Sequence, residues 1–180
     1  MLKAIKHCRE KMILELKGLY AGLRFSSAHV VFGHDSCGVI HGHTYYVDVK
    51  LYGEPSGDFG FILDFKILKK IVKKICKTLD HKLLIPKNHP NLKYSIVNNH
   101  IIYTFCNKDN NKEYQVPLED ILLLPLKGTT AEELSIYIAE LIKKELSNLN
   151  VDYNIYYVEV TLYEGLGQGA TYRISLDNEN

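Results

Sequence analysis

Three histidines of this sequence have the types and spacing of metal ligands. His41 and His43 are two residues apart, so in a strand both imidazoles would point to one face, and Gly42 would leave room between them. His29 lies twelve residues before His41, in a segment that we expect to pair with that strand. Three neutral imidazoles would leave zinc its charge and an open coordination position, which is typical of catalytic sites. The pattern therefore predicts a zinc site at His29, His41 and His43.

Alternatives exist for the residues around this motif. Two histidines at this spacing are, by themselves, more often ordinary hydrogen-bonded side chains, but the third histidine and Cys37 favour a metal site. His34 could replace His29 as a ligand, although it falls in an irregular turn. A thiol on a loop beside a cation loses its proton readily, and the thiolate is a base or nucleophile. A cysteine without such neighbours is a small hydrophobic residue, which is our interpretation of Cys8, Cys76 and Cys106.

Three acid–base residues elsewhere in the chain could complete a site. Asp80 precedes His81 directly, and a carboxylate beside an imidazole can fix its tautomer and raise its basicity. From spacing alone, the pair is more readily explained as the polar C-terminal end of a helix. Glu164 ends an apolar strand beside several glycines, and a carboxylate there could accept two parallel hydrogen bonds from a pterin or guanine edge. Its plain alternative is a surface glutamate at a strand end.

Two periodicities predict the elements that would position these residues. Alternating apolar and polar residues predict strands at 19–31, 43–52, 156–162 and 172–176. Asp64 should cap a helix that runs to about Leu79, and Thr130 with Glu133 forms a capping box for a helix that ends at 148–150. Strands with one polar side, separated by helices, indicate an α+β fold: an antiparallel four-stranded sheet with two helices packed on one face.

The remaining segments are less regular. Residues 2–16 have a weak helical pattern, and we expect a short helical extension. Segments 94–97 and 101–105 flank Asn98-Asn99 and predict a hairpin, followed by a polar loop at 107–113. The length suits a single domain over 1–180, with an N-terminal extension at 1–17 and an insertion at 86–127.

Composition excludes several classes of partner. The 22 basic and 21 acidic residues give a net charge of only +1, which argues against a nucleic-acid partner. Charged residues interrupt the N-terminal segment, and no run has the ~18 apolar residues of a membrane helix, so we expect neither a signal peptide nor a membrane partner. The four cysteines form no CxxC pair, so we expect a reducing compartment and a cytoplasmic protein.

Six motifs, in this order, resemble the 6-pyruvoyltetrahydropterin synthase and 6-carboxytetrahydropterin synthase family of tunnelling-fold enzymes. The resemblance covers roughly 19–85 and 126–176. It rests on Phe25-Ser26-Ser27-Ala28-His29, Cys37 to His43, Leu63-Asp64-Phe65, Leu79-Asp80-His81, Thr129-Thr130-Ala131-Glu132, and Glu164 before a glycine turn.

The resemblance implies roles for these residues. His29, His41 and His43 would bind zinc, and Cys37 would be the catalytic thiol. The dyad of Asp80 and His81 would transfer protons, and the pterin would be bound by Glu164, Thr129 and Thr130. Such enzymes form homo-oligomers, trimers stacked into hexamers, so the dyad could serve a neighbouring subunit's Cys37.

The resemblance also implies a reaction. Three residues separate Cys37 from His41, a spacing that resembles the 6-carboxytetrahydropterin enzymes. The implied reaction converts 7,8-dihydroneopterin triphosphate to 6-carboxy-5,6,7,8-tetrahydropterin with release of acetaldehyde and triphosphate, feeding 7-deazaguanine synthesis of the queuosine and archaeosine type. One alternative is a 6-pyruvoyltetrahydropterin synthase or related pterin lyase. Another, of a different class, is a non-catalytic zinc module that binds a pterin or purine.

Overall fold

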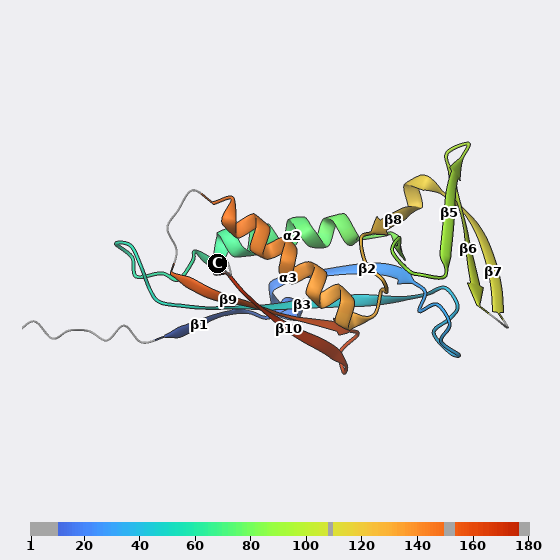
Figure 1. Cartoon of the computed structure of the whole chain (residues 1–180). Coiled ribbons are helices and arrows are strands. Elements are labelled where there is room, and N and C mark those ends of the chain that lie inside the picture. The colour runs from blue at the N-terminus through green and yellow to red at the C-terminus, as the bar shows by residue number, and fades with distance from the viewer. Residues whose placement is uncertain (1–10, 108–109, 150–153, 177–180) are drawn as a thin grey trace, which may run out of the picture.

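A mixed sheet is the larger layer of the protein (Figure 1). The computed structural model describes residues 11–107, 110–149 and 154–176. Within these residues the sheet has seven strands in the order β10-β9-β3-β2-β4-β8, and β1 also pairs with β3. Antiparallel pairs join β1, β2, β3, β9 and β10, whereas β2–β4 and β4–β8 are parallel. The bounds are β1 Met12–Leu16, β2 Arg24–His29, β3 His41–Gly53, β4 Leu83–Pro86, β8 Ile121–Leu124, β9 Ile155–Glu164 and β10 Gly169–Ser175.

Two long helices cover one face of this sheet (Figure 1). Helix α2 (Phe65–Leu79) begins after Asp64, whose carboxylate accepts the Lys66 N–H at 2.7 Å, as predicted. Helix α3 (Ala131–Ser147) begins after Thr130, whose hydroxyl accepts the Glu133 N–H at 3.5 Å. A short helix, α1 (Gly18–Ala21), and a 3-10 turn, η1 (Leu118–Asp120), lie between strands. No helix in the described part of the chain is long and apolar enough to cross a membrane.

The main core lies between the sheet and these helices. Every second residue of β3 from Tyr45 to Leu51 is fully buried, because successive strand side chains point to opposite faces. Leu68 and Val72 of α2 and Ile138 of α3 are fully buried against this face. The helix-facing side of β3 therefore passes from apolar side chains directly into His43 and His41 at its start.

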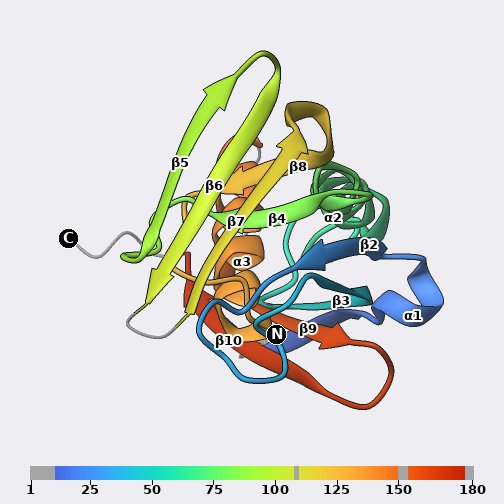
Figure 2. The same cartoon turned by 90° about the vertical axis from the view of Figure 1, so that its right-hand side faces the viewer.

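A three-stranded antiparallel sheet stands beyond the end of the main sheet (Figure 2). It consists of β5 (Leu92–Val97), β6 (His100–Asn107) and β7 (Asn110–Pro117). The predicted hairpin between β5 and β6 is confirmed, and Asn98 and Asn99 turn it with φ of 47° and 60°. A second apolar cluster, which includes Ile101, Tyr103 and Phe105, packs this sheet against β4 and β8.

The α+β fold with helices on one face is confirmed, but several boundaries are not. The predicted helix at 2–16 is wrong over Met12–Leu16, which is β1, because pairing with β3 outweighs a weak helical pattern; 1–10 lie outside the described residues. The strand predicted at 19–31 begins as α1. The loop predicted at 107–113 contains the start of β7. The sheet exceeds four strands because β1, β4 and β8 extend it.

Candidate metal centre and active site

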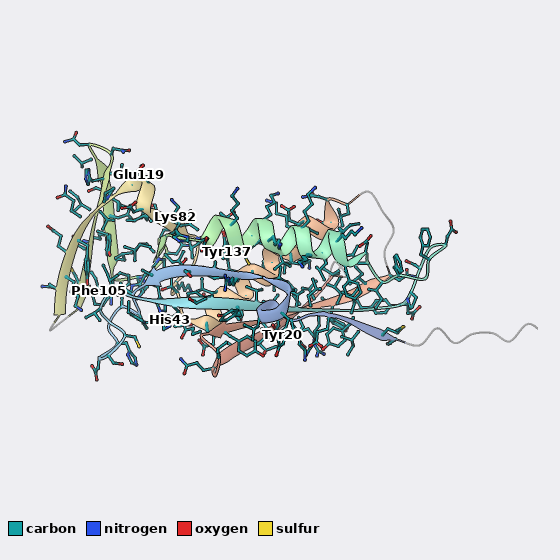
Figure 3. All side chains as sticks on the ribbon, turned by 180° about the vertical axis from the view of Figure 1, so that it is seen from behind. Tyr20, His43, Lys82, Phe105, Glu119 and Tyr137 are labelled. Atoms are coloured by element: carbon teal, nitrogen blue, oxygen red, sulfur yellow. The ribbon has the colours of Figure 1, made fainter. Side chains whose placement is uncertain are left out.

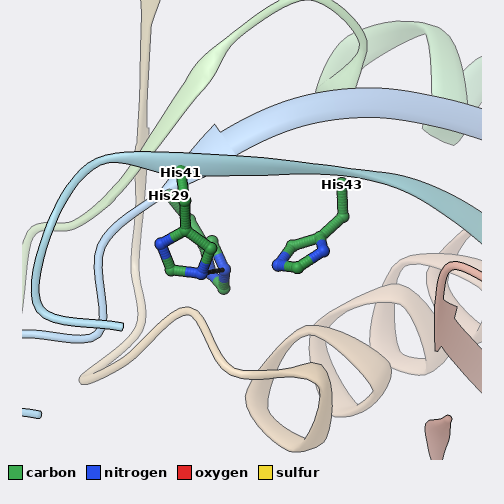
Figure 4. Close-up of side chains that lie close together, drawn as sticks. All are labelled: His29, His41 and His43. Atoms are coloured by element: carbon green, nitrogen blue, oxygen red, sulfur yellow. Dashed lines mark hydrogen bonds between the residues drawn. The ribbon is translucent and has the colours of Figure 1, made fainter. Parts of the chain in front are cut away.

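His29, His41 and His43 converge at one end of the helix-facing side of the sheet. His29 ends β2 and lies directly opposite His41, the first residue of β3. Figure 4 shows the three imidazoles projecting to the same side of the strands. Their candidate ligand atoms all lie within 4.8 Å of one another, so the group could hold a metal ion.

Backbone carbonyls fix the orientation of two of these rings. His29 Nδ1 lies 2.7 Å from the Thr129 carbonyl oxygen, and His41 Nδ1 lies 2.8 Å from that of Val39. Because a carbonyl only accepts, each Nδ1 must carry the hydrogen, and each neutral ring then keeps its lone pair on Nε2. The two Nε2 atoms face each other at 3.0 Å. This arrangement of two ring nitrogens is suited to sharing a metal ion.

The buried position of His29 disfavours its protonated form. The pKa of His29 is lowered to about 4, chiefly by burial and also by the neighbouring His41 and His43, against the raising effect of the Thr129 carbonyl. His29 is only 2% exposed. A buried neutral imidazole with its second nitrogen bound to a carbonyl is the usual state of a metal-bound histidine. The donor set of three imidazoles fits zinc.

Cys37 lies in the loop between β2 and β3 and lines the same hollow. This hollow has a volume of about 350 Å³ and is also lined by His29, His41, His43 and Glu164. The loop is closed on itself, because the Val31 N–H donates to the Cys37 carbonyl at 2.9 Å and the Cys37 N–H donates to His34 Nδ1 at 3.1 Å. His34 therefore supports the loop, and it is not in the metal-ligand group.

Glu164, at the end of β9, faces the histidines from the neighbouring strand. Its Oε1 lies 4.0 Å from His29 Nε2, and its side chain is 18% exposed. Thr130 and Glu132, at the start of α3, line the hollow from the side of the helices. Thr129 does not line it: it is buried, its carbonyl holds His29, and its hydroxyl donates to the Val30 carbonyl at 3.2 Å.

Asp80 and His81 lie in a different place. They follow α2, and Asp80 Oδ2 lies 2.8 Å from His81 Nδ1, so the predicted pair is formed. Burial raises the pKa of Asp80, but hydrogen bonds from the Ser26 N–H and from His81 outweigh it and keep that pKa below its ordinary value. The His81 side chain is 84% exposed and lines a second hollow of about 550 Å³, next to Ser26 and Thr44. Within one chain, the structure does not bring this dyad into the hollow of Cys37.

Two further residues, which the sequence analysis did not identify, lie against this region. Tyr45 is wholly buried two residues after His43. The centroid of its ring lies 6.2 Å from that of His29 and 5.6 Å from that of His43. The period-two pattern that located His41 and His43 could have found it. Lys112 of β7 donates to the carbonyl of Gly38 at 2.5 Å. No sequence signal joins those two residues, which are 74 positions apart.

Comparison with known proteins decides the family. Residues 19–175 match the sequence profile of the family described as 6-pyruvoyl tetrahydropterin synthase. The chain belongs to this family. A relative from Methanocaldococcus jannaschii, provisionally named 6-carboxy-5,6,7,8-tetrahydropterin synthase, is 58% identical over 166 residues, 92% of this chain and 99% of the relative. A Rickettsia typhi 6-carboxy-5,6,7,8-tetrahydropterin synthase is 26% identical over 143 residues, 78% of this chain and 88% of that protein.

Solved structures of the 6-pyruvoyl tetrahydropterin synthase family share the fold. The Plasmodium vivax 6-pyruvoyltetrahydropterin synthase superposes with a TM-score of 0.81 at 32% identity, covering 92% of this chain and 99% of that one. The Plasmodium falciparum protein superposes with a TM-score of 0.81 at 30% identity, covering 92% and 98%. The tunnelling fold is therefore confirmed, and the chain is a lyase-type enzyme of the pterin synthase family.

Proposed function

We propose that this chain is a zinc-dependent 6-carboxy-5,6,7,8-tetrahydropterin synthase. Its substrate would be 7,8-dihydroneopterin triphosphate, and acetaldehyde and triphosphate would leave. The observation that carries the proposal is one hollow lined by the three histidines, Cys37 and Glu164. The name of the 58% identical archaeal relative and the short spacing between Cys37 and His41 support the 6-carboxy product.

In this proposal His29, His41 and His43 hold zinc. Zinc, when bound, would supply a Lewis acid next to the side-chain oxygens of the substrate. The Thr129 and Val39 carbonyls hold the His29 and His41 rings with Nε2 toward the ion. His43 would complete the set from the next position on the same face of β3.

Cys37 and Glu164 would act on opposite parts of the substrate. The Glu164 carboxylate would accept two parallel hydrogen bonds from the amino and ring N–H groups of the pterin, a charge-assisted pair. Thr130, at the start of α3, would bind the same ring from the helix side, and Thr129 would act through His29. Cys37 would then face the pterin side chain and take a proton from its carbon as a general base.

The dyad of Asp80 and His81 would work on a neighbouring subunit. Its separation from Cys37 within one chain, and the exposure of the His81 side chain, support a site that is completed only in a homo-oligomer, a trimer or hexamer. The Asp80 carboxylate would hold the His81 imidazole by its Nδ1 and leave Nε2 to exchange a proton with a substrate bound next door. We place this enzyme in the cytoplasm, in 7-deazaguanine synthesis.

A 6-pyruvoyltetrahydropterin synthase is the second candidate. The solved structures that share this fold at 30–32% identity are named for that activity. Both reactions would start from the same substrate in the same hollow, so the products separate them. Acetaldehyde is released only in the 6-carboxy reaction.

Product analysis of the zinc-loaded protein tests the proposal. We would incubate it with 7,8-dihydroneopterin triphosphate and identify the products by mass spectrometry, with the Cys37→Ala variant in parallel. The matched control is Cys106→Ala, because Cys106, which we expected to be a small buried residue, is exposed on β6. We expect 6-carboxytetrahydropterin and acetaldehyde from the wild type and Cys106→Ala, and neither from Cys37→Ala. A 6-pyruvoyl product would establish the second candidate, and bound pterin without turnover would establish a binding module.

A further inference from the structure

The loop that carries Cys37 touches the three-stranded sheet of β5, β6 and β7 at two points, one on each side of the cysteine. We call this sheet the inserted sheet because the chain forms it between β4 and β8 of the main sheet. Before it, the ring of Phe32 stacks on that of Phe105 with centroids 5.0 Å apart. After it, Lys112 Nζ donates a hydrogen bond to the Gly38 carbonyl at 2.5 Å. Figure 3 shows Phe105 where the inserted sheet meets the ends of the main strands, near His43.

Both contacts come from one face of the inserted sheet. Phe105 on β6 and Lys112 on β7 are directly opposite each other in the strand register, so their side chains project from the same side. Phe105 is 2% exposed, and it belongs to the apolar cluster that packs this sheet against β4 and β8. The sheet is thus anchored independently of the loop and offers it a fixed surface.

The loop's internal bonds do not by themselves set its position. The Val31–Cys37 and Cys37–His34 hydrogen bonds close the loop on itself, so they would move with it. The bond from Lys112 instead joins the residue after Cys37 to another part of the chain. Lys112 does not line the hollow of the histidines, so its ammonium is placed to hold the backbone and not the substrate.

We propose that Lys112 is a positioning residue, which with Phe105 fixes the Cys37 loop so that the thiol faces the hollow of the three histidines. This inference rests on the proposed role of Cys37 as the base. A misplacement of about 1 Å at a reacting group can lower a rate by up to about a hundredfold. The inserted sheet thereby becomes part of the active-site machinery.

Steady-state kinetics with three variants test the proposal. Lys112→Met removes the donor and keeps the stem, Lys112→Arg restores donors, and Lys93→Met removes an exposed lysine from β5 of the same sheet. We expect kcat of Lys112→Met to fall about tenfold to a hundredfold with little change in KM. Lys112→Arg should recover most of the loss, and Lys93→Met should equal the wild type. A raised KM with unchanged kcat would overturn the proposal, because it would indicate a contact with substrate.

Amide hydrogen exchange measures the stability of the Cys37 loop without any enzymatic turnover. In the zinc-loaded protein without substrate, we expect the amides of Val31 and Cys37 to exchange about tenfold faster in Lys112→Met, with the core of β3 unchanged. Equal exchange in both proteins would overturn the positioning role. If the wild type turns over no pterin, the proposed function fails while the exchange result still decides the position of the loop. Lys112→Leu, which also lacks a donor, replaces Lys112→Met if the latter does not fold.

Discussion

Tyr45 and Glu164 lie directly opposite each other on β3 and β9, at the point where the apolar core meets the histidines. Tyr45 is wholly buried and stacks on Phe25 with ring centroids 4.7 Å apart. Burial, and then the nearby Glu164 carboxylate, raise the pKa of its hydroxyl. That hydroxyl has no hydrogen bond of ordinary length to any residue that the structure describes, but the Glu164 carboxylate is close enough to act on it as a weak acceptor. The core therefore ends in a weakly bonded hydroxyl beside the proposed pterin anchor.

Removing the Tyr45 hydroxyl should leave the fold intact. A buried hydroxyl without a hydrogen bond of ordinary length adds little stability, so Tyr45→Phe should change the free energy of unfolding by no more than about 1 kcal/mol. Urea unfolding would measure it. Tyr103→Phe, at the other buried hydroxyl without a partner among the described residues, is the control. A loss above about 2 kcal/mol would mean that the hydroxyl has a partner in solution.

Neutralising Glu164 should weaken pterin binding without loss of metal. Glu164→Gln replaces one acceptor of the proposed pair with a donor, so the dissociation constant for a pterin should rise about tenfold to a hundredfold. Calorimetry with zinc-loaded protein would measure it. Glu132→Gln, which lines the same hollow from α3, should bind like the wild type. If Glu164→Gln binds the pterin as tightly as Glu132→Gln does, Glu164 is not the pterin anchor.

Metal content should separate the ligand histidines from His34. His41→Ala should lose bound zinc and the stabilisation that zinc provides, about 2.7 kcal/mol at a zinc concentration one hundred times the dissociation constant. His34→Ala should keep zinc but lose activity, because His34 Nδ1 accepts the Cys37 N–H. Elemental analysis and thermal unfolding with and without a chelator would measure both. Zinc lost from His34→Ala and kept in His41→Ala would reverse the assignment.

Mixed oligomers should reveal whether the dyad acts between subunits. Cys37→Ala and His81→Ala should each be inactive alone. Coexpressed in equal amounts, they should regain about a quarter of wild-type activity, since random pairing leaves both residues intact in that share of shared sites. Assay of the purified mixed oligomer would measure it. Complete inactivity of the mixture would place Cys37 and His81 of each site on one chain.

An ion cluster on the other face of the sheet should make stability depend on pH. Burial raises the pKa of Glu159, but hydrogen bonds from Arg173, Lys50 and Tyr52 at 2.5–3.0 Å outweigh it and hold the pKa below its ordinary value of 4.5. Because the folded pKa is the lower one, the carboxylate stabilises the fold above pH 4.5, and this contribution is lost as pH falls through the folded value.

Replacement of Glu159 provides the measurement. Glu159→Gln should lower the free energy of unfolding by about 1–2 kcal/mol at pH 7, and the difference from the wild type should shrink below pH 4.5. The control is Glu145→Gln, which breaks a more exposed pair with Lys74 and should have little effect. A difference independent of pH would indicate lost packing and not lost charge.

The sequence indicated elements whose patterns are local. Strand β3 has a period-two burial pattern, and helix α2 begins after a capping aspartate. Both signals lie within the segment itself, so both elements were predictable. Strands β4 and β8 have four residues each, and β4 is buried throughout, so no alternation marks them; their parallel partners lie far along the chain. The same limit applies to the site. His41 and His43 share a strand, whereas the contact of Lys112 with Gly38 depends on how two sheets meet.

The inserted sheet leaves the main sheet after β4 and returns at β8, and these two strands are immediate neighbours. The chain between them can therefore lengthen, shorten or be exchanged for another module without shifting β2 or β3, which carry the histidines. Divergence at this one junction would change how the cysteine loop is supported while leaving the metal ligands in place. Related enzymes could in this way differ in the position of the catalytic cysteine while they keep the same metal ligands.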